Sequence, residues 1–312
     1  MAKQKQGNGK LSTIVLIFLF LVFIGTMACG VMLYKENNNL DSISLSLDKI
    51  YEEYVERKND SNEEIKKIEK EIEELNKIDE KILNEKKLYF ENIKKLEDKI
   101  IAGESDKKIA YLTFDDGPYN LTYEYLEVLN KYNVKATFFT IGAGKERCLD
   151  KKDISCYPVY KAIVENGHTI ANHTFSHGIR TGLYSSSESF ITQVKKQEEL
   201  IKEQTGVITN IVRFPGGSVT AKGYKNEIIE KLREINYGWV DWTALDGDGG
   251  ALSSKEQAIT TFKNSINQNI EVVLLHDYNQ ITLDILPEII EYLQDNGYIL
   301  LPLFYESNMI NK

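Results

Sequence analysis

Short apolar runs alternate with amphipathic stretches from residue 108 to the end of the chain. The apolar runs have the length of strands, whereas apolar residues in the stretches between them recur at helical spacing. Regular alternation of this kind predicts an α/β fold, with a parallel sheet or barrel and helices outside it. The expected strands are 109–114, 136–141, 168–172, 211–214, 238–242, 272–275 and 298–301, and the expected helices are 121–132, 157–166, 186–205, 225–236, 254–268 and 282–295.

A heptad pattern precedes this region. With Ile65 as position a, apolar residues fill most a and d positions, and Glu and Lys fill most others, so residues 63–101 predict a long helix with a coiled-coil seam. A second amphipathic stretch, 43–54, lies before the polar residues 58–62. These form either a turn, which makes a hairpin within one chain, or a stutter in one rod that needs a partner chain. We expect 41–101 to be a helical coiled-coil stalk that brings a second copy or another protein as partner, the alternative being a solvated charged linker.

Residues 11–33 carry no formal charge and are rich in Leu, Ile, Val and Phe. As a helix this run is roughly 34 Å long, enough to span a hydrocarbon core of about 30 Å. Three lysines precede it, so the positive-inside rule predicts that residues 1–10 are a cytoplasmic tail. We therefore expect a single-pass protein of the cell membrane, anchored by a transmembrane helix, with everything after Tyr34 extracytoplasmic. The alternative is a cleaved signal peptide or a lipoprotein signal ending at Cys29.

Charge and cysteine content narrow the partners and the compartment. The net charge is −9 and no segment has a large basic surplus, so we expect no nucleic-acid partner and favour a neutral, carbohydrate-like substrate. Cys148 and Cys156 can close a small loop in an oxidising compartment. The alternative is two unpaired thiols, and their spacing is not that of a zinc ribbon.

Polar side chains gather where the expected strands end. Folds with parallel strands and outer helices carry their chemistry at the carboxyl ends of the strands. We therefore expect these side chains to meet at one face. They are Asp115 and Asp116 after the first strand, His173 and His177 after the third, Arg213 in the fourth, Asp248 after the fifth and His276 after the sixth.

The two histidines and one of the aspartates suit a metal ion. His173 and His177 are four residues apart, so on one helical turn, or a loop of similar pitch, both can face one ion. One carboxylate of the pair Asp115 and Asp116 offers a third ligand. A site with two histidines and one carboxylate leaves positions open for water and substrate, as catalysis requires. The alternative is a pair of ordinary surface or capping histidines.

The remaining groups suit acid and base catalysis. The second carboxylate can take a proton from water beside the metal, and Arg213 can hold it ionised. His276 can donate a proton to a leaving group, and Asp248 can orient its other nitrogen. A structural salt bridge is the alternative for Arg213 and Asp248, and we expect His168 to be a structural histidine. The set predicts a metal-dependent hydrolase of esters or amides.

Five ordered motifs resemble the polysaccharide deacetylases with a NodB-homology domain, carbohydrate esterase family 4. The resemblance implies a distorted (β/α) barrel over residues 107–305 that hydrolyses N-acetyl groups of amino-sugar polymers. It also implies a divalent cation, commonly Zn²⁺, with Co²⁺, Ni²⁺, Fe²⁺ and Mn²⁺ as alternatives. The motifs are Thr113-Phe114-Asp115-Asp116-Gly117-Pro118, His173 to His177, Arg213-Phe214-Pro215, Asp248 and Leu274-Leu275-His276-Asp277.

The resemblance assigns a role to each matching position. It implies that Asp116, His173 and His177 bind the metal, that Asp115 is the base braced by Arg213, and that His276 is the acid oriented by Asp248. It further implies that Leu274 walls the acetyl-methyl pocket and that the Gly216 N–H stabilises the oxyanion. Gly216 and Gly249 stand where many members have aromatic residues. Trp242 can replace that groove surface or can be a core residue.

Topology points to the substrate. An enzyme on a stalk outside the membrane meets the cell wall, so we expect a peptidoglycan N-acetylglucosamine deacetylase acting on a cell-wall glycan. Alternatives are a deacetylase of N-acetylmuramic acid or of secreted poly-N-acetylglucosamine, and a catalytically idle glycan-binding module.

Overall fold

The computed structural model describes residues 40–142 and 157–312. The expected membrane anchor, 11–33, and the expected disulfide between Cys148 and Cys156 lie outside the described residues. The helices are α2 (Leu40–Ile101), α3 (Thr122–Lys131), α4 (Tyr157–Glu165), α5 (Ser187–Thr205), α6 (Lys225–Glu234), α7 (Lys255–Ser265) and α8 (Gln280–Asp295), with short 3₁₀ segments at Ile179–Thr181 and Ser218–Tyr224. The strands are β1 (Lys108–Asp115), β2 (Thr137–Thr140), β3 (Thr169–Asn172), β4 (Ile211–Val212), β5 (Gly238–Trp239), β6 (Ala244–Leu245), β7 (Ile270–His276) and β8 (Tyr298–Leu301).

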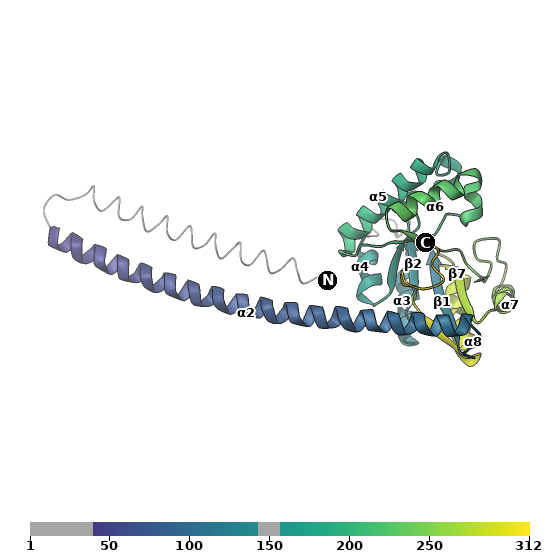
Figure 1. The fold of residues 1–312 in the computed structure, drawn as a ribbon, viewed down its shortest axis with the longest axis horizontal. Helices are drawn as coiled ribbons and strands as arrows, with labels where there is room; N and C mark the ends of the chain where they lie inside the picture. The colour runs from purple at the N-terminus through teal and green to yellow at the C-terminus, as the bar shows by residue number, and fades with distance from the viewer. Residues whose placement is uncertain (1–39, 143–156) are drawn as a thin grey trace. The chain divides into compact units, whose positions relative to one another are not determined.

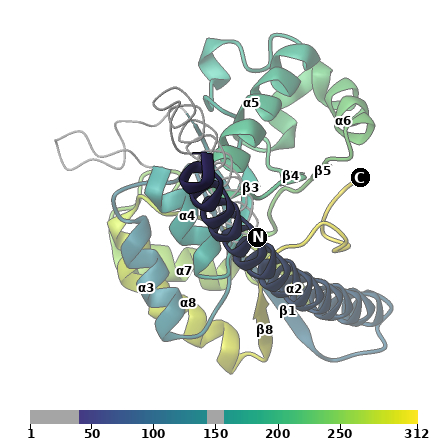
Figure 2. The same ribbon diagram turned by 90° about the vertical axis from the view of Figure 1, so that its left-hand side faces the viewer.

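The chain divides into two compact units, Met1–Lys87 and Leu88–Lys312. The second unit holds one curled sheet in the order β5-β4-β3-β2-β1-β7-β6, with β8 paired to β1. Each ladder between named strands is parallel. Neighbouring helices pack in the matching order α6, α5, α4, α3, α8, α7 around the strands (Figures 1 and 2). The expected parallel fold with outer helices is therefore confirmed, as a curled half-barrel.

The expected strand 238–242 is shorter in the structure. β5 ends at Trp239, and β6 begins only at Ala244, on the opposite edge of the sheet. Between them the carbonyl oxygens of Val240 and Asp241 accept hydrogen bonds from the Arg213 guanidinium. A side chain from β4's end thus replaces part of the strand pairing.

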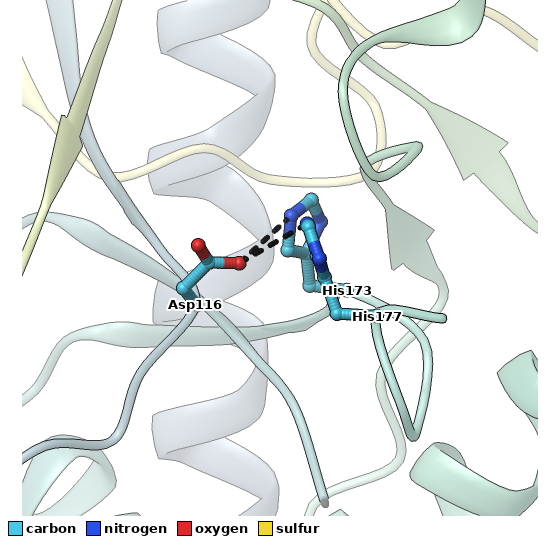
Figure 3. Close-up of side chains that lie close together, drawn as sticks. All are labelled: Asp116, His173 and His177. Carbon is cyan, nitrogen blue, oxygen red and sulfur yellow. Dashed lines mark ion pairs between the residues drawn. The ribbon is translucent and has the colours of Figure 1, made fainter. Parts of the chain in front are cut away.

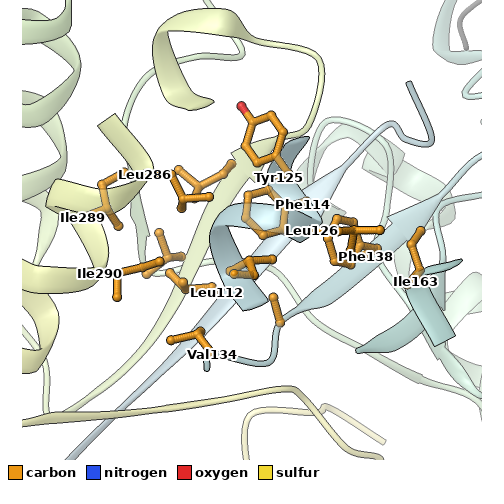
Figure 4. Packing of buried hydrophobic residues seen from close by; sticks show 14 of the residues in the cluster. Leu112, Phe114, Tyr125, Leu126, Val134, Phe138, Ile163, Leu286, Ile289 and Ile290 are labelled. Carbon is orange, nitrogen blue, oxygen red and sulfur yellow. The ribbon is translucent and has the colours of Figure 1, made fainter. Parts of the chain in front are cut away.

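Alternation along β1 separates two cores. Ala110, Leu112 and Phe114 face outward and pack with apolar residues of α3, α4 and α8 (Figure 4). Ile109 and Tyr111 face inward, into a second cluster. Because successive strand residues point to opposite faces, the side chain of Asp115 also faces inward, at the carboxyl end of β1.

The end of α2 belongs to the second unit. Ile93 and Ile100 are buried in the inner cluster, and Phe90 stacks on Phe304 with ring centroids 4.7 Å apart. Glu97 is fully buried, and its carboxylate accepts hydrogen bonds from the Tyr111 hydroxyl at 2.5 Å and from two groups of the C-terminal segment. The compact unit therefore begins at Leu88, earlier than the start at 107 expected from the motifs.

In the first unit, α2 runs unbroken through residues 58–62. These residues include no Gly or Pro, and the Ser61 hydroxyl donates to the Arg57 carbonyl, one turn back in the helix. The interpretation of 58–62 as a hairpin turn is therefore wrong, which leaves a continuous helix. Seam residues such as Leu75 and Ile82 are exposed, so the coiled coil stays a prediction. No helix of the described part of the chain is long and apolar enough to span a bilayer.

Candidate metal and catalytic centre

The polar residues expected at the strand ends converge. Asp115 ends β1 and Asp116 follows it, while His173 and His177 lie in the loop after β3. His276 ends β7, which pairs with β1. Arg213 follows β4 directly, and Asp248 lies in the loop after β6. Since the ladders are parallel, these ends meet at one rim of the half-barrel.

Asp116, His173 and His177 point toward one another (Figure 3). Asp116 Oδ1 lies 3.5 Å from His173 Nε2 and 3.3 Å from His177 Nε2. One ligand atom from each residue lies within 4.8 Å of the other two. The predicted grouping of these three side chains is thus present, on a loop and not on a helical turn.

The backbone around this trio is unusual. Asp116, Thr174 and His177 have positive φ angles of 71°, 64° and 51°, although none is glycine. Such conformations cost about 1–3 kcal/mol each and persist where the surroundings fix them. Here the Asn172 side chain accepts from the Thr174 N–H, and the Thr174 hydroxyl accepts from the His177 N–H. The loop is held in the shape that aims both imidazoles at Asp116.

The donor set fits a divalent cation. His173 Nδ1 lies 2.8 Å from the Arg213 carbonyl oxygen, which can only accept, so Nδ1 carries the proton and Nε2 presents a lone pair. Burial lowers the pKa of His173 to about 3, so the ring is neutral. Asp116 Oδ1 is buried and has no hydrogen-bond partner among the described residues. A cation between these atoms would satisfy it.

Asp115 lies beside the trio and is braced. Its Oδ2 is 3.6 Å from His173 Nε2, and its Oδ1 accepts from Arg213 at 2.8 Å. Arg213 is fully buried and also donates to the Thr113 hydroxyl at 2.7 Å. Burial raises the pKa of Asp115, whereas the Arg213 charge opposes that rise. The guanidinium therefore keeps a buried carboxyl group able to ionise.

His276 stands on the other side of Asp116. Its Nδ1 is 2.6 Å from Asp248 Oδ1, and its backbone N–H donates to Asp248 Oδ2 at 2.7 Å. Its Nε2 lies 4.0 Å from Asp116 Oδ2. Burial lowers the pKa of His276, but Asp248, Asp115 and Asp116 together raise it to about 9. The ring therefore carries a proton near neutral pH, and Asp248 holds its orientation.

The three expected groove residues lie near this rim. Leu274 is two residues before His276 on β7 and pairs in register with Thr113. A side chain added at Gly217 would meet the ring of Trp242 at 3.1 Å, and that ring lies 6.0 Å from the Arg213 guanidinium carbon. Gly216 is exposed, with φ 73°, and its carbonyl accepts from the Thr220 hydroxyl.

Some contacts were not foreseen. Arg213 hydrogen-bonds the Thr113 hydroxyl. Asp248 hydrogen-bonds Asp246 through its backbone N–H and Thr282 through its carboxylate. The contact of Thr113 could have been predicted from the sequence, because Thr113 lies two residues before Asp115 on the same strand face. His168 lies away from the rim, and its Nδ1 accepts from the Ala136 N–H, as a structural histidine would.

Comparison with known proteins agrees with this geometry. The family model described as "Polysaccharide deacetylase" matches residues 102–239. A peptidoglycan-N-acetylglucosamine deacetylase of Bacillus cereus is 29% identical over 200 residues, which cover 62% of this chain and 68% of that protein. The crystal structure of the catalytic domain of a peptidoglycan N-acetylglucosamine deacetylase from Eubacterium rectale is 33% identical. It has a TM-score of 0.59 and covers 66% of this chain and 93% of that one.

A polysaccharide deacetylase from Bacillus cereus is a further structural relative. It is 28% identical, has a TM-score of 0.57, and the similarity covers 65% of this chain and 95% of that one. The resemblance inferred from the five sequence motifs is thereby confirmed. The chain belongs to the polysaccharide deacetylases of carbohydrate esterase family 4, which are hydrolases.

Proposed function

We propose that this chain is a metal-dependent deacetylase that hydrolyses N-acetyl groups of a cell-wall glycan, with peptidoglycan N-acetylglucosamine as the substrate. The observation that carries the proposal is the grouping, at one rim, of a ligand-like trio, a braced carboxylate and a histidine held by a carboxylate. A module that only bound glycan would have no use for that complete set.

In this proposal Asp116, His173 and His177 hold the cation. Two imidazole nitrogens and one carboxylate oxygen suit Zn²⁺, and also Co²⁺, Ni²⁺, Fe²⁺ or Mn²⁺. When bound, the cation polarises the amide carbonyl and lowers the pKa of water. Since affinity alone does not select among these metals, zinc is the first candidate to load and the others are tested beside it.

The protein side chains move the protons. Asp115 accepts a proton from the water that attacks the amide carbon, and Arg213 stabilises its ionised form. Amide cleavage leaves an amine, which must be protonated as the C–N bond breaks. His276 donates that proton, and Asp248 holds its ring in place. The products are acetate and the free amino sugar.

The proposed substrate contacts follow the resemblance. Leu274 walls the acetyl-methyl pocket, which is consistent with its position two residues before His276 on the same strand. The Gly216 N–H stabilises the oxyanion, and Trp242 forms one wall of the sugar groove. Gly216 and Gly249 leave that groove wider than an aromatic pair would.

The choice of peptidoglycan is supported by the named activity of the Bacillus cereus and Eubacterium rectale relatives. The alternatives are N-acetylmuramic acid and secreted poly-N-acetylglucosamine. Acetate release measured side by side from purified peptidoglycan, soluble chitin oligomers and acetylated xylan separates them. Release from peptidoglycan supports the proposal if chemical re-N-acetylation of the product shows that the free amines lie on glucosamine. Release from xylan alone overturns it.

We further propose that residues 11–33 anchor the protein in the cell membrane with the catalytic domain outside. We also propose that the expected stalk, 41–101, joins two copies or a partner protein through residues 41–87, the part that precedes the second compact unit. The uncharged run and the heptad pattern support this. Protease added to intact cells should remove the catalytic domain. Cross-linking through a cysteine introduced at Leu75 should yield a dimer if the partner is a second copy.

A further inference from the structure

A second buried carboxylate lies behind the pair of Asp248 and His276. Asp246 is fully buried and is two residues before Asp248. The hydroxyl of Thr282, in the first turn of α8, lies 2.7 Å from Asp246 Oδ2 and 3.1 Å from Asp248 Oδ2. Thr282 is also fully buried. One hydroxyl group therefore lies between two carboxyl groups.

The hydrogen bonds between the Thr282 hydroxyl and the two carboxyl groups require one more proton than the hydroxyl supplies. A hydroxyl carries a single proton and can donate to only one of the two carboxyl groups. Two ionised carboxylates would leave the other one facing an oxygen lone pair in a buried site, which is costly. A proton on one carboxyl group resolves this, because that group then donates to the hydroxyl.

The other hydrogen bonds of the two carboxyl groups indicate that the proton is on Asp246. Asp248 already accepts from His276 Nδ1 and from the His276 N–H, as an anion does. Besides its contact with the Thr282 hydroxyl at Oδ2, Asp246 accepts the Asp248 N–H at Oδ1 and makes no contact with a cationic group comparable to His276 among the hydrogen bonds of the described residues. Burial and the nearby Asp248 charge raise the pKa of Asp246 to about 7, in keeping with a neutral Asp246.

We propose that Asp246 is a positioning residue for the proton donor of the reaction. It holds a proton on Oδ2 and donates it in a hydrogen bond to Thr282, whose hydroxyl donates to Asp248, so that the Asp248 carboxylate keeps the His276 ring in one orientation. The catalytic consequence rests on the proposed function, whereas the relay itself is a property of the fold. Asparagine offers the same pattern, an oxygen for the Asp248 N–H and an N–H for Thr282.

The substitutions that test the relay come in matched pairs. In the zinc-loaded full chain, Asp246→Asn should keep kcat for acetate release within about threefold, while Asp246→Ala should lower kcat about 100-fold with KM little changed. Thr282→Ser should keep kcat and Thr282→Val should lower it similarly. Thr137→Val is the control, because Thr137 is fully buried and its hydroxyl accepts from the Leu303 N–H, a contact that involves neither Asp246 nor Thr282.

A second readout does not need activity. The chain has four histidines, so ¹⁵N-histidine labelling gives a simple NMR spectrum. The Nδ1 proton between His276 and Asp248 should give a downfield signal that disappears in His276→Asn. Asp246→Asn and Thr282→Ser should retain that signal, and Asp246→Ala and Thr282→Val should shift or broaden it. Unfolding temperatures identify any variant that does not fold, in which case the Thr282 pair decides.

Two results would overturn the relay. Asp246→Asn losing both the signal and kcat, as Asp246→Ala does, would mean that an ionised Asp246 is required. Unchanged signal and kcat in Asp246→Ala and Thr282→Val would mean that neither residue positions His276. A wild-type chain that releases no acetate from any glycan would end the proposed function, while the NMR comparison would still decide the relay.

Discussion

Asp115 and His276 are register partners on the neighbouring parallel strands β1 and β7. The proposed base and the proposed acid therefore stand side by side on the most extensively paired part of the sheet, with Asp116 directly after the base. Arg213 braces one and Asp248 the other. The sheet fixes their separation, so the catalytic geometry depends on β-sheet register more than on loop conformation.

Replacing the base should stop turnover and leave the metal site intact. Asp115→Asn removes the proton acceptor but keeps the shape of the side chain, so kcat should fall by about 10²–10⁴-fold. Zinc content should stay near that of the wild type, because Asp115 is not one of the three proposed ligands. Asp295→Asn, at an exposed position, is the control. Near-normal kcat in Asp115→Asn would refute the assignment of the base.

Turnover should decline at high pH, as His276 loses its proton. The balance of burial against the charges of Asp248, Asp115 and Asp116 raises the pKa of His276 to about 9. A cation held by Asp116 cancels part of that charge, so the basic limb of the zinc-loaded enzyme should lie at or below that pH. Asp248→Asn should move the limb to lower pH. An unmoved limb in this variant argues against His276 as the acid.

The end of α2 should be part of the stable catalytic unit. Glu97→Ala leaves the buried Tyr111 and Ser307 hydroxyls and the Asn308 N–H without their acceptor. The free energy of unfolding, measured with urea, should drop by about 3 kcal/mol. Glu91→Ala, at an exposed position of the same helix, should change it by less than about 0.5 kcal/mol. Equal effects of the two substitutions would exclude this anchoring role.

Acid should destabilise the fold through His168. Burial lowers its pKa to about 4, with Lys135 adding to the effect, against 6.5 for a free histidine. Between these values the unfolded chain binds the extra proton, so this stability is complete above pH 6.5 and is lost as the pH falls toward 4.

His168→Asn should remove that dependence, because an amide oxygen can accept from the Ala136 N–H without titrating. Urea unfolding of both proteins at about pH 7.5 and about pH 5 should show an extra loss of about 2 kcal/mol in the wild type. Comparing the two proteins cancels the contributions of other buried acids. Parallel losses in both would show that His168 is not responsible.

The sequence predicted the rim of the site because its signals are local. A buried strand followed by Asp115 and Asp116, or a strand followed by His173 and His177, can be recognised without knowing the fold. The partners behind them cannot. Thr282 is an ordinary residue of an amphipathic helix, and only the packing of α8 brings its hydroxyl to Asp248. Tertiary hydrogen bonds of this kind leave no periodic trace in the sequence.

The α2 helix shows a second limit. A heptad pattern predicts an apolar stripe but not what covers it. Ile93 and Ile100 continue the stripe, yet they pack on the inner cluster of the half-barrel. Glu97 occupies a polar heptad position and is nevertheless fully buried, because the C-terminal segment folds over it. Sequence periodicity therefore predicted the helix, but it did not predict the surface against which the end of the helix packs.

The most direct measurement is acetate release from purified peptidoglycan by the full chain before chelation, after removal of metal and after addition of Zn²⁺. The account predicts release that is lost with the metal and regained with about one zinc bound per chain, and Asp116→Ala that neither binds zinc nor releases acetate. Undiminished release by metal-free protein would contradict it, as would zinc bound at full occupancy in Asp116→Ala.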